Sequence, residues 1–323
     1  MRLKAFLNRD GGTFRTTDMA EYERLAEHIF RQAGHDFDCV VVSGKDIVET
    51  MQREAASGDR DGLIAGGGDG TISTAASICW KNGIALGVIP AGTMNLFARS
   101  LKLPLDIRVV LETLANGHVE AVDIGSANGK SFVHQFSAGL HARMVRYRNA
   151  MTFASRLGKM RASARAAVGV VFNPPVFDVE FKVDGHMQHR TVSAISVSNN
   201  EFGPDPLMFA DNLKGGRLGF YLAQEMRPAG VARLAFDILR GRLKDNIDVT
   251  AMASTSIDLH FPKEGGRSNC VIDGELLPMP RDVALRLHPG ELKVIVGDPP
   301  VAPTLIERVA AVLPAGRPAG LDA

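Results

Sequence analysis

A glycine-rich run around a single aspartate has the composition of a phosphate-binding turn. It spans residues 66–71 and reads Gly-Gly-Gly-Asp-Gly-Thr, directly after a short apolar stretch. Glycines allow positive φ angles and close approach of a phosphate to main-chain N–H groups, and a following helix directs its N-terminus at that phosphate. The carboxylate of Asp69 can hold a Mg²⁺ ion that bridges phosphate oxygens, and Thr71 adds a hydroxyl. The run lacks the third glycine of the dinucleotide fingerprint G-x-G-x-x-G.

Apolar runs and helical patterns alternate through the first third of the chain. We expect strands at 3–7, 37–42 (buried on both faces), 63–66 and 84–89, with helices between them. This order predicts a parallel sheet covered by helices, in which ligands bind beyond the carboxyl ends of the strands. The residues expected at these ends are Asn8, Ser43, Gly67, Gly68, Asp69, Gly70 and Thr71.

A second turn with ligand-binding side chains follows the fourth strand. It begins at Pro90, opens at Gly92, and carries Thr93 and Asn95 as hydrogen-bonding side chains. A helix is expected to continue to about residue 101, another at 105–116, and then a strand at 119–125 that carries Asp123.

Two motifs together resemble the diacylglycerol kinase catalytic family, which includes bacterial soluble lipid kinases, sphingosine kinases and ceramide kinases. They are Gly-Gly-Asp-Gly-Thr at 67–71 and Pro-Ala-Gly-Thr-x-Asn-x-Phe-Ala-Arg at 90–99. NAD kinases and phosphofructokinases share the first motif, whereas the second is specific to the lipid kinases. The resemblance extends from Asn8 to about Val296. It implies ATP and Mg²⁺ as cofactors, with Ser43 at the nucleotide and Asp69 and Asp123 at the metal.

The pattern changes after residue 125, where short alternating runs predict an antiparallel β domain. We therefore expect an α/β nucleotide-binding domain at 1–125, a lipid-binding β domain at 126–300 and a tail at 301–323. The family resemblance implies that the second domain is a β-sandwich and that the active site lies between the domains. The expected strands are 177–183, 191–198, 218–223, 247–250, 256–261, 283–287 and 292–296.

The sequence Asp273-Gly274-Glu275 ends an apolar strand in the β domain. Taken by itself, it is typical of an ordinary turn. The family has Asp-Gly-Glu at this place, so the resemblance implies that Asp273 or Glu275 accepts the proton of the substrate hydroxyl. Both residues remain candidates.

Two positions depart from the family pattern. Many bacterial members have an aspartate near the metal where this chain has Leu96. Many also bind a structural Mg²⁺ through an Asp-Gly-x-Leu-Asp stretch in the β domain. Here residues 214–219 read Lys-Gly-Gly-Arg-Leu-Gly and contain no carboxylate. This composition argues against a structural metal at the loop, and Asp211 is the neighbouring carboxylate that could act as a substitute ligand.

The composition limits the kinds of partner and the compartment that we expect for the protein. With 37 lysines and arginines against 36 acidic residues, the chain is not typical of a nucleic-acid binder. Three scattered cysteines favour a reducing cytoplasm, and no apolar run predicts a signal peptide or a membrane span. The stretch 143–165 has seven cationic and no acidic side chains among apolar ones, as in surfaces that dock on anionic lipid. A solvated cationic helix is the alternative.

The predicted function is transfer of the γ-phosphoryl group of ATP to a lipid hydroxyl. The resemblance makes diacylglycerol the first choice of acceptor, and a sphingoid base, a ceramide-like lipid or an undecaprenol-type alcohol remain open. Phe136, Leu140 and Phe202 are candidates for the acceptor pocket. Two alternatives are a NAD kinase, whose Asn-Glu pair is matched by Asn200-Glu201, and a non-catalytic regulator that binds nucleotide or lipid. The oligomeric state is not encoded in any pattern.

Overall fold

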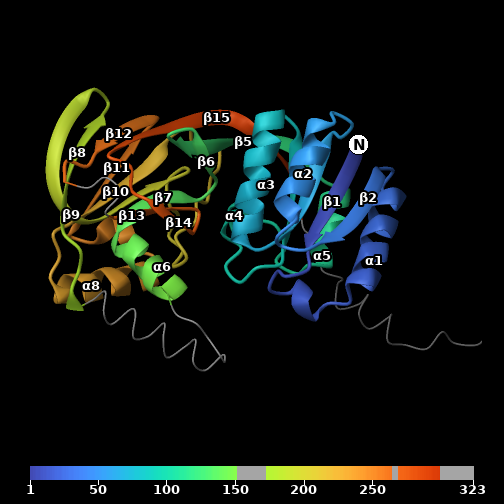
Figure 1. Ribbon diagram of the computed structural model, residues 1–323, viewed down its shortest axis with the longest axis horizontal. Coiled ribbons are helices and arrows are strands. Elements are labelled where there is room, and N and C mark those ends of the chain that lie inside the picture. Colours follow the sequence, from blue (N-terminus) through green and yellow to red (C-terminus); the bar gives the residue numbers. More distant parts are fainter. Residues whose placement is uncertain (151–171, 264–267, 299–323) are drawn as a thin grey trace, which may run out of the picture.

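The computed structural model describes residues 1–150, 172–263 and 268–298. Figure 1 shows two units side by side: helices around parallel strands at the N-terminal end, and antiparallel strands with helices at their lower edge. Most of the basic stretch 143–165 and the tail 301–323 lie outside the described residues. Within these residues, no helix is long and apolar enough to cross a bilayer.

The N-terminal sheet is parallel, as predicted, and has the order β4-β3-β1-β2. Its strands are β1 (Arg2–Asn8), β2 (Asp36–Val42), β3 (Gly62–Gly67) and β4 (Ala85–Pro90). β3 and β4 are buried at every residue because they have neighbours on both sides and helices on both faces. The expectation of a fully buried second strand is wrong: β2 forms the edge of the sheet, and only Phe37 in it is buried.

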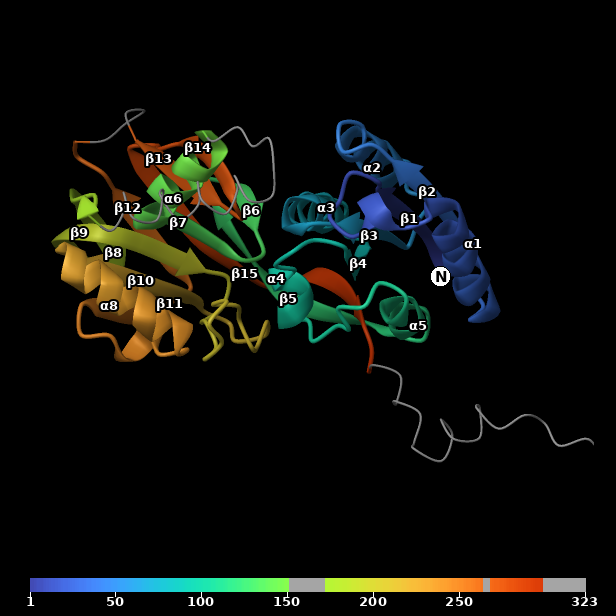
Figure 2. The same ribbon diagram turned by 90° about the horizontal axis from the view of Figure 1, so that it is seen from below.

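Helices cover both faces of this sheet (Figure 2). On one face lie α1 (Met19–Gln32) and α5 (Val109–Ala115), and on the other α2 (Ile47–Ala56) and α3 (Asp69–Asn82). Asp18 caps α1 by accepting hydrogen bonds from the N–H groups of Ala20 and Glu21, as its sequence pattern indicates. The short helix α4 (Leu96–Ser100) follows β4, and η1 (Phe14–Thr16) follows β1. The helix expected at 105–116 forms only from Val109.

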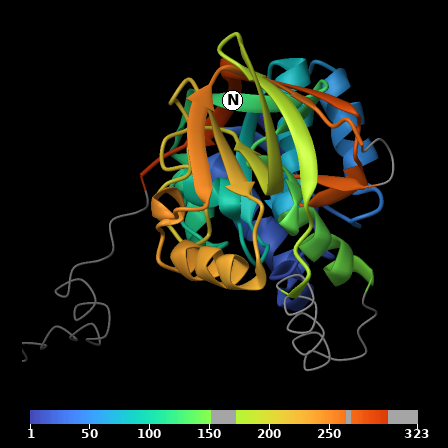
Figure 3. The same ribbon diagram turned by 90° about the vertical axis from the view of Figure 1, so that its left-hand side faces the viewer.

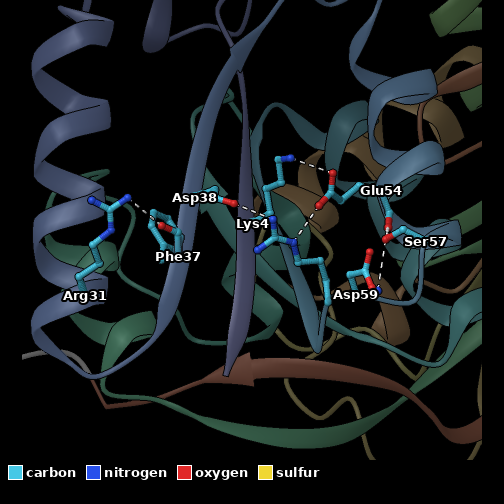
Figure 4. Close-up of polar contacts among 8 residues, drawn as sticks. Lys4, Arg31, Phe37, Asp38, Glu54, Ser57 and Asp59 are labelled. Carbon is cyan, nitrogen blue, oxygen red and sulfur yellow. Dashed lines mark hydrogen bonds and ion pairs between the residues drawn. The ribbon is translucent and has the colours of Figure 1, made fainter.

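A network of charged side chains fastens α2 to the outer strands of the sheet (Figure 4). Glu54 of α2 accepts hydrogen bonds from Lys4 and Arg60, both at 2.8 Å. Arg60 also reaches Asp38 on β2, at 2.6 Å. Burial raises the pKa of Glu54, but the hydrogen bonds from Lys4 and Arg60 outweigh it and hold the pKa below its usual value.

The C-terminal region is antiparallel and curls around a second core. β9 (His186–Ser198) is shared by both layers, because its first half pairs with β8 (Phe177–Val183) and its second half pairs with β7 (Gln135–Gly139) and β10 (Leu218–Gln224). Phe181 and Phe220 meet edge to face across the core at 5.3 Å, which joins β8 to β10. The other strands here are β6 (Lys130–Phe132), β11 (Val249–Ser254), β12 (Ser256–His260), β13 (Asn269–Ile272) and β14 (Glu275–Pro278).

Two helices lie at one end of this region, on the outer face of the sheet (Figure 3). They are α6 (Leu140–Ala150), which follows β7, and α8 (Pro228–Leu239), which follows β10. The short helix η2 (Leu243–Asp245) connects α8 to β11.

Two long strands connect the units, and Figure 1 shows both crossing from one to the other. β5 (His118–Ala127) runs antiparallel to β15 (Asp282–Val296) over most of its length. β15 pairs with β12 near its start and with β4 at Val294, so it is a single strand where two were expected. The predicted border at residue 125 falls within β5, and we propose it as the division between the domains.

Candidate active site

The loops after the four parallel strands meet at one edge of the sheet. Asn8, at the end of β1, donates a hydrogen bond to the hydroxyl of Thr71 at 3.1 Å. The N–H of Thr13 donates to the carbonyl of Ala91 at 2.9 Å, which joins the loop after β1 to the loop after β4. The structure therefore brings together the loop residues that the sequence placed at carboxyl ends.

The loop after β2 joins the same edge through an aspartate that the sequence patterns did not indicate. Asp10 accepts a hydrogen bond from the N–H of Gly44 at 2.7 Å. The neighbouring Ser43 donates to Asp46 at 2.5 Å, which orients its side chain at the start of α2.

The glycines of the turn allow neighbouring groups to come close to the backbone, and they do not adopt unusual backbone angles. None of Gly66, Gly67, Gly68 and Gly70 has a positive φ, so that part of the expectation is wrong. A Cβ on Gly67 would lie 2.8 Å from the side chain of Thr71. A Cβ on Gly92 would lie 2.7 Å from the Cα of Gly68, so the two candidate phosphate loops touch each other through bare backbone.

Asp69 is the first residue of α3 and binds the second loop. Its two carboxylate oxygens accept hydrogen bonds from the N–H groups of Asn95, at 3.1 Å, and Leu96, at 2.7 Å. Each oxygen accepts one of these bonds, so each keeps one lone pair for a further partner.

Asn95 holds the second loop in shape. Its backbone has a φ of 52°, and its side-chain oxygen accepts from the N–H of Gly92 at 2.8 Å while its amide donates to the carbonyl of Gly92 at 3.0 Å. Thr93 is exposed at the tip of this loop. The side chain of Asn95 is thus occupied within its own loop, and Thr93 is the hydroxyl that faces outward.

Asp273 brings the C-terminal unit to this edge. One of its oxygens accepts from Ser73 at 2.6 Å and from the N–H of Val133 at 2.9 Å. The other accepts from the N–H groups of His134, at 3.0 Å, and Gln135, at 2.9 Å. Since Ser73 lies in the second turn of α3, this carboxylate links the helix behind the glycine turn directly to the β domain.

The environment of Asp273 has opposing effects on its ionisation. Burial raises the pKa of its carboxyl group, and the hydroxyl of Ser73 and the three N–H groups lower it, with burial prevailing. Its backbone has a φ of 45°, which is uncommon for a residue with a side chain. The four donors keep this turn in a single conformation.

Glu275 lies two residues further on and is much more accessible. Its side chain is 61% exposed and pairs with Lys130 at 2.6 Å. The turn that contains Asp273 fixes the backbone of Glu275 at the start of β14, while the carboxylate of Glu275 keeps lone pairs free.

Asp123 shares no contact with Asp69, and it joins two loops of the β domain to β15. Its side chain accepts hydrogen bonds from the side-chain amide of Asn200 at 2.8 Å, and from the N–H groups of Gly216 at 2.8 Å and Gly290 at 3.0 Å. The loop at 214–219 is thus held by Asp123 through Gly216. No three acidic, histidine or cysteine side chains converge within the described part of the chain.

His134 is a further site residue that the sequence patterns did not indicate. It follows Val133 in the segment that binds Asp273, and its ring lies 5.7 Å from the ring of Phe202. Burial lowers the pKa of His134 to about 4, and the nearby charge of Asp69 opposes this only in part. A neutral imidazole therefore lies between the two units. The sequence could not indicate His134, because a single histidine in an apolar run has no partner residue at a spacing that is typical of a site.

An apolar cavity of about 280 Å³ lies beside this junction, between the outer face of the antiparallel sheet and the helices α6 and α8. Leu140 and Phe202, two of the three candidates for an acceptor pocket, line it, whereas the third, Phe136, lies in the core between the two layers. The polar lining residues include Gln135, whose N–H binds Asp273, so the cavity begins next to the Asp273 turn. Its apolar lining includes Met144, Ile195, Met208, Tyr221, Val231, Leu234, Ile238 and Val249.

Comparison with known proteins identifies the N-terminal unit. Residues 2–127 match the family model described as the diacylglycerol kinase catalytic domain. The diacylglycerol kinase of Bacillus subtilis (strain 168) is 28% identical over 222 residues, which covers 66% of this chain and 71% of that protein. The diacylglycerol kinase of Staphylococcus epidermidis (strain ATCC 12228) is 41% identical over 98 residues, which covers 28% of this chain and 29% of that protein.

Solved structures share the fold over almost the whole chain. Two structures from Bacillus anthracis str. Sterne, both assigned to diacylglycerol kinases, superpose with TM-scores of 0.73 and 0.69 at 22% and 19% sequence identity. Each comparison covers 93% of this chain, and 96% and 98% of the respective structures. These structures therefore share with this chain the combination of a parallel-sheet unit and an antiparallel β unit.

At the junction, the unit with the glycine turn faces the β unit across Asp273. Residues 2–127 carry the diacylglycerol kinase catalytic domain, and this domain, together with the kinases that the chain resembles, makes the protein a kinase.

Proposed function

We propose that the protein transfers the γ-phosphoryl group of ATP to the hydroxyl of a lipid, with diacylglycerol as the acceptor and phosphatidic acid as the product. The observation that carries this proposal is the 2.6 Å hydrogen bond between Ser73 and Asp273. It joins the helix that starts at the glycine turn to the Asp-Gly-Glu turn of the β unit. The proposed phosphate-binding turn and the turn that carries the proposed proton acceptor would thereby be kept close together, as phosphoryl transfer requires.

The phosphates of ATP would lie over the loops after β1, β3 and β4. The N–H groups of 67–71 and the exposed hydroxyl of Thr93 are suited to bind them, and Asn8 and Thr71 keep the first and third loops together. Ser43 would contact the nucleotide from the end of β2. In phosphoryl transfer, positioning and charge neutralisation account for most of the catalysis.

The residues present fit a magnesium ion held mainly through phosphates. Asp69 keeps a lone pair on each carboxylate oxygen, and the side-chain oxygens of the buried Asn199 and Asn200, beside Asp123, have no partner among the described residues. Oxygen ligands of this kind suit Mg²⁺, which commonly uses one or two carboxylates together with substrate phosphates. When bound, the ion would neutralise charge on the phosphate oxygens. Asp69 would hold it, with Asp123 supporting its water shell.

Glu275 is the proton acceptor in this proposal. An ionised carboxylate has about four lone-pair positions, and the four donors around Asp273 use all of them. Asp273 therefore fixes the turn, and Glu275 accepts the proton as the lipid oxygen forms its bond to the γ-phosphorus. The bond between the γ-phosphorus and the bridging oxygen breaks, and ADP leaves with that oxygen.

The apolar cavity beside Gln135 would take part of the acceptor's hydrocarbon. Its lining is almost entirely apolar, and it starts next to the Asp273 turn. A lipid with its hydroxyl at Glu275 could thus bury an acyl chain between the sheet and α8. A lipid acceptor also requires contact with a membrane, so we propose a cytoplasmic protein that binds the bilayer peripherally.

The test is a panel of acceptors with labelled ATP and Mg²⁺. Diacylglycerol, sphingosine, ceramide, undecaprenol and NAD would be supplied separately to the purified protein. Label in phosphatidic acid supports the proposal, and label in another lipid corrects the acceptor. Label in NAD alone, or ATP binding with no transfer to any acceptor, would overturn it.

A further inference from the structure

A second cavity lies on the other side of α6 from the apolar one and is basic. Its volume is about 210 Å³, and it is lined by Arg143 and Arg146 together with residues of the segment before β8 and of β13. None of its described lining residues is acidic. The two arginines are three residues apart on a helix, so their guanidinium groups lie on the same side of it.

The guanidinium groups in this cavity have unused hydrogen-bonding capacity. Arg143 donates to the carbonyl of Asn173 at 2.6 Å and to the hydroxyl of Tyr147 at 3.5 Å, and its buried Nε has no partner among the described residues. Neither Arg143 nor Arg146 forms an ion pair with a carboxylate in the described part of the chain. A guanidinium group offers several N–H donors in one plane, an arrangement that fits a phosphate. The cavity is therefore suited to a phosphate group.

Exposed apolar side chains surround both cavities. Phe172 is 72% exposed next to Asn173, and Val176, in the lining of the basic cavity, is 48% exposed. At the apolar cavity, Leu239 is 70% exposed beside a lining residue of α8, and Ile247 is 74% exposed in the connection from η2 to β11. Phe172, Leu239 and Ile247 are the three most exposed large apolar side chains of the described residues, and their presence beside the two cavities marks an interaction surface.

Figures 1 and 3 show α6 and α8 at the same end of the β unit, away from the turn between β8 and β9. This end combines apolar side chains at the surface with arginines that lack acidic partners within the described ranges. A bilayer that contains anionic phospholipid complements both features, since it offers hydrocarbon below a layer of phosphates.

We infer that the end formed by α6 and α8 docks on an anionic phospholipid bilayer, with a lipid phosphate bound between Arg143 and Arg146. The inference rests on the proposed lipid-kinase function, for which it names the docking face. When the protein is docked in this way, its apolar cavity opens towards the hydrocarbon of the bilayer, and the hydrocarbon chain of an acceptor enters the cavity without crossing water.

The test is binding to vesicles by co-sedimentation, with phosphatidylcholine alone or mixed with phosphatidylglycerol. We expect binding to the mixed vesicles that weakens as salt is added. The double variant Arg143→Gln/Arg146→Gln should bind about thirtyfold less tightly, since each cation near an anionic surface contributes a several-fold gain. The variant Leu239→Ser/Ile247→Ser should also lose affinity, about tenfold, and it should do so at high salt as well.

Matched controls come from the opposite end of the same unit. Lys182→Gln/Arg190→Gln removes the same charge from the exposed ribbon of β8 and β9, and Met187→Ser removes an apolar side chain that is 67% exposed there. Both controls should bind vesicles as the wild type does. Nucleotide binding and thermal unfolding, measured on every variant, check that the fold is retained.

Three results would overturn the docking face: no binding of the wild type to mixed vesicles, unchanged binding of the arginine variant, or equal losses in the controls. Failure of the proposed function is distinguishable. In that case the wild type binds vesicles through this face but phosphorylates neither vesicle lipid nor soluble dioctanoylglycerol. Turnover of dioctanoylglycerol without vesicle binding would remove the docking face and keep the function.

Discussion

The carboxylate of Asp273 holds the two units together at the site. It accepts a side-chain hydrogen bond from Ser73 and three backbone hydrogen bonds from 133–135. Such a group is costly to move, because any displacement leaves several buried donors without a partner. The position of Glu275 therefore depends on helix α3, through Ser73 and Asp273.

Ser73→Ala tests this dependence. Burial already raises the folded-state pKa of Asp273 above its unfolded value, so the stability that this carboxyl group contributes is fully present below the unfolded pKa and is lost as pH rises through the folded pKa. Loss of the Ser73 donor raises that pKa further. We expect the variant to lose about 1–2 kcal/mol of unfolding free energy at neutral pH, and much less below the pKa of Asp273.

Urea unfolding at several pH values measures this difference. Ser73→Thr should recover both stability and turnover, because it restores the hydroxyl. Thr74→Ala is the matched control, since that hydroxyl bonds to Gly70 within α3. A pH-independent loss in Ser73→Ala would show that Ser73 does not act through the Asp273 carboxylate.

Residue types and spacing could predict the loop residues but not the partners of Asp273. The turn from Gly67 to Thr71 and the segment after Pro90 can both be recognised from their own residue types. The order of the parallel strands is then enough to place them at one edge of the sheet. The bonds of Asp273 join residues about 140 and 200 positions apart, and no local pattern records them. For the same reason the sequence left Asp273 and Glu275 as equal candidates and did not indicate His134.

At the scale of elements, the site depends on two loops whose backbones touch. At Gly92 there is no space for a side chain between the turn before α3 and the turn after β4, because an added Cβ would lie 2.7 Å from the Cα of Gly68. Asp69 then fastens the second turn by capping the start of α4.

Gly92→Ala should separate these loops, because the new Cβ would lie 2.7 Å from the Cα of Gly68. We expect a loss of about 1–3 kcal/mol in unfolding free energy and a clear loss of ATP affinity by calorimetry. Gly230→Ala, in α8 and away from the nucleotide loops, is the control, since a Cβ added there would meet only ordinary contacts at 3.5 Å or more. Unchanged nucleotide affinity in Gly92→Ala would contradict the loop contact as a feature of the nucleotide site.

Glu54→Gln tests the network that holds α2 to the sheet. Because the folded-state pKa of Glu54 is depressed, its contribution is present above the unfolded pKa and is lost as pH falls through the folded value. The variant should be about 1–2 kcal/mol less stable than wild type at pH 7. The difference should close as the pH falls through this depressed pKa, below the usual range of a glutamate. A constant difference across pH in chemical unfolding would exclude the charged network as its cause.

The element order of the N-terminal unit follows from hydrophobic periodicity, and its four parallel strands lie close to their expected bounds. The periodicity could not reveal that β2 is an edge strand, since edge and centre depend on strand order. It also split β15 in two at Pro289-Gly290, where the strand is irregular but its pairing with β5 continues on both sides.

At the scale of the molecule, β5 and β15 connect the units, and the apolar cavity proposed to hold the acceptor lies next to the junction between the units. Filling the cavity should therefore affect the lipid and not the nucleotide. For Ala194→Phe, on the cavity floor, we expect kcat/KM for long-chain diacylglycerol to fall at least tenfold while ATP affinity stays unchanged. Ala232→Phe, on the exposed side of α8, is the matched control. Equal acceptor kinetics in both variants would show that the cavity does not hold the acceptor.

Transfer of labelled γ-phosphate to diacylglycerol, compared between the wild type and Glu275→Gln, is the decisive experiment for the proposed reaction and its base. Because Glu275 is exposed, we expect the substitution to have little effect on folding stability. Measurements of nucleotide binding and thermal unfolding would check this. We expect phosphatidic acid from the wild type and a rate lower by about 10²–10⁴ in the variant, with ATP still bound. Wild-type turnover in Glu275→Gln, or no labelled lipid from the wild type, would contradict the proposed roles.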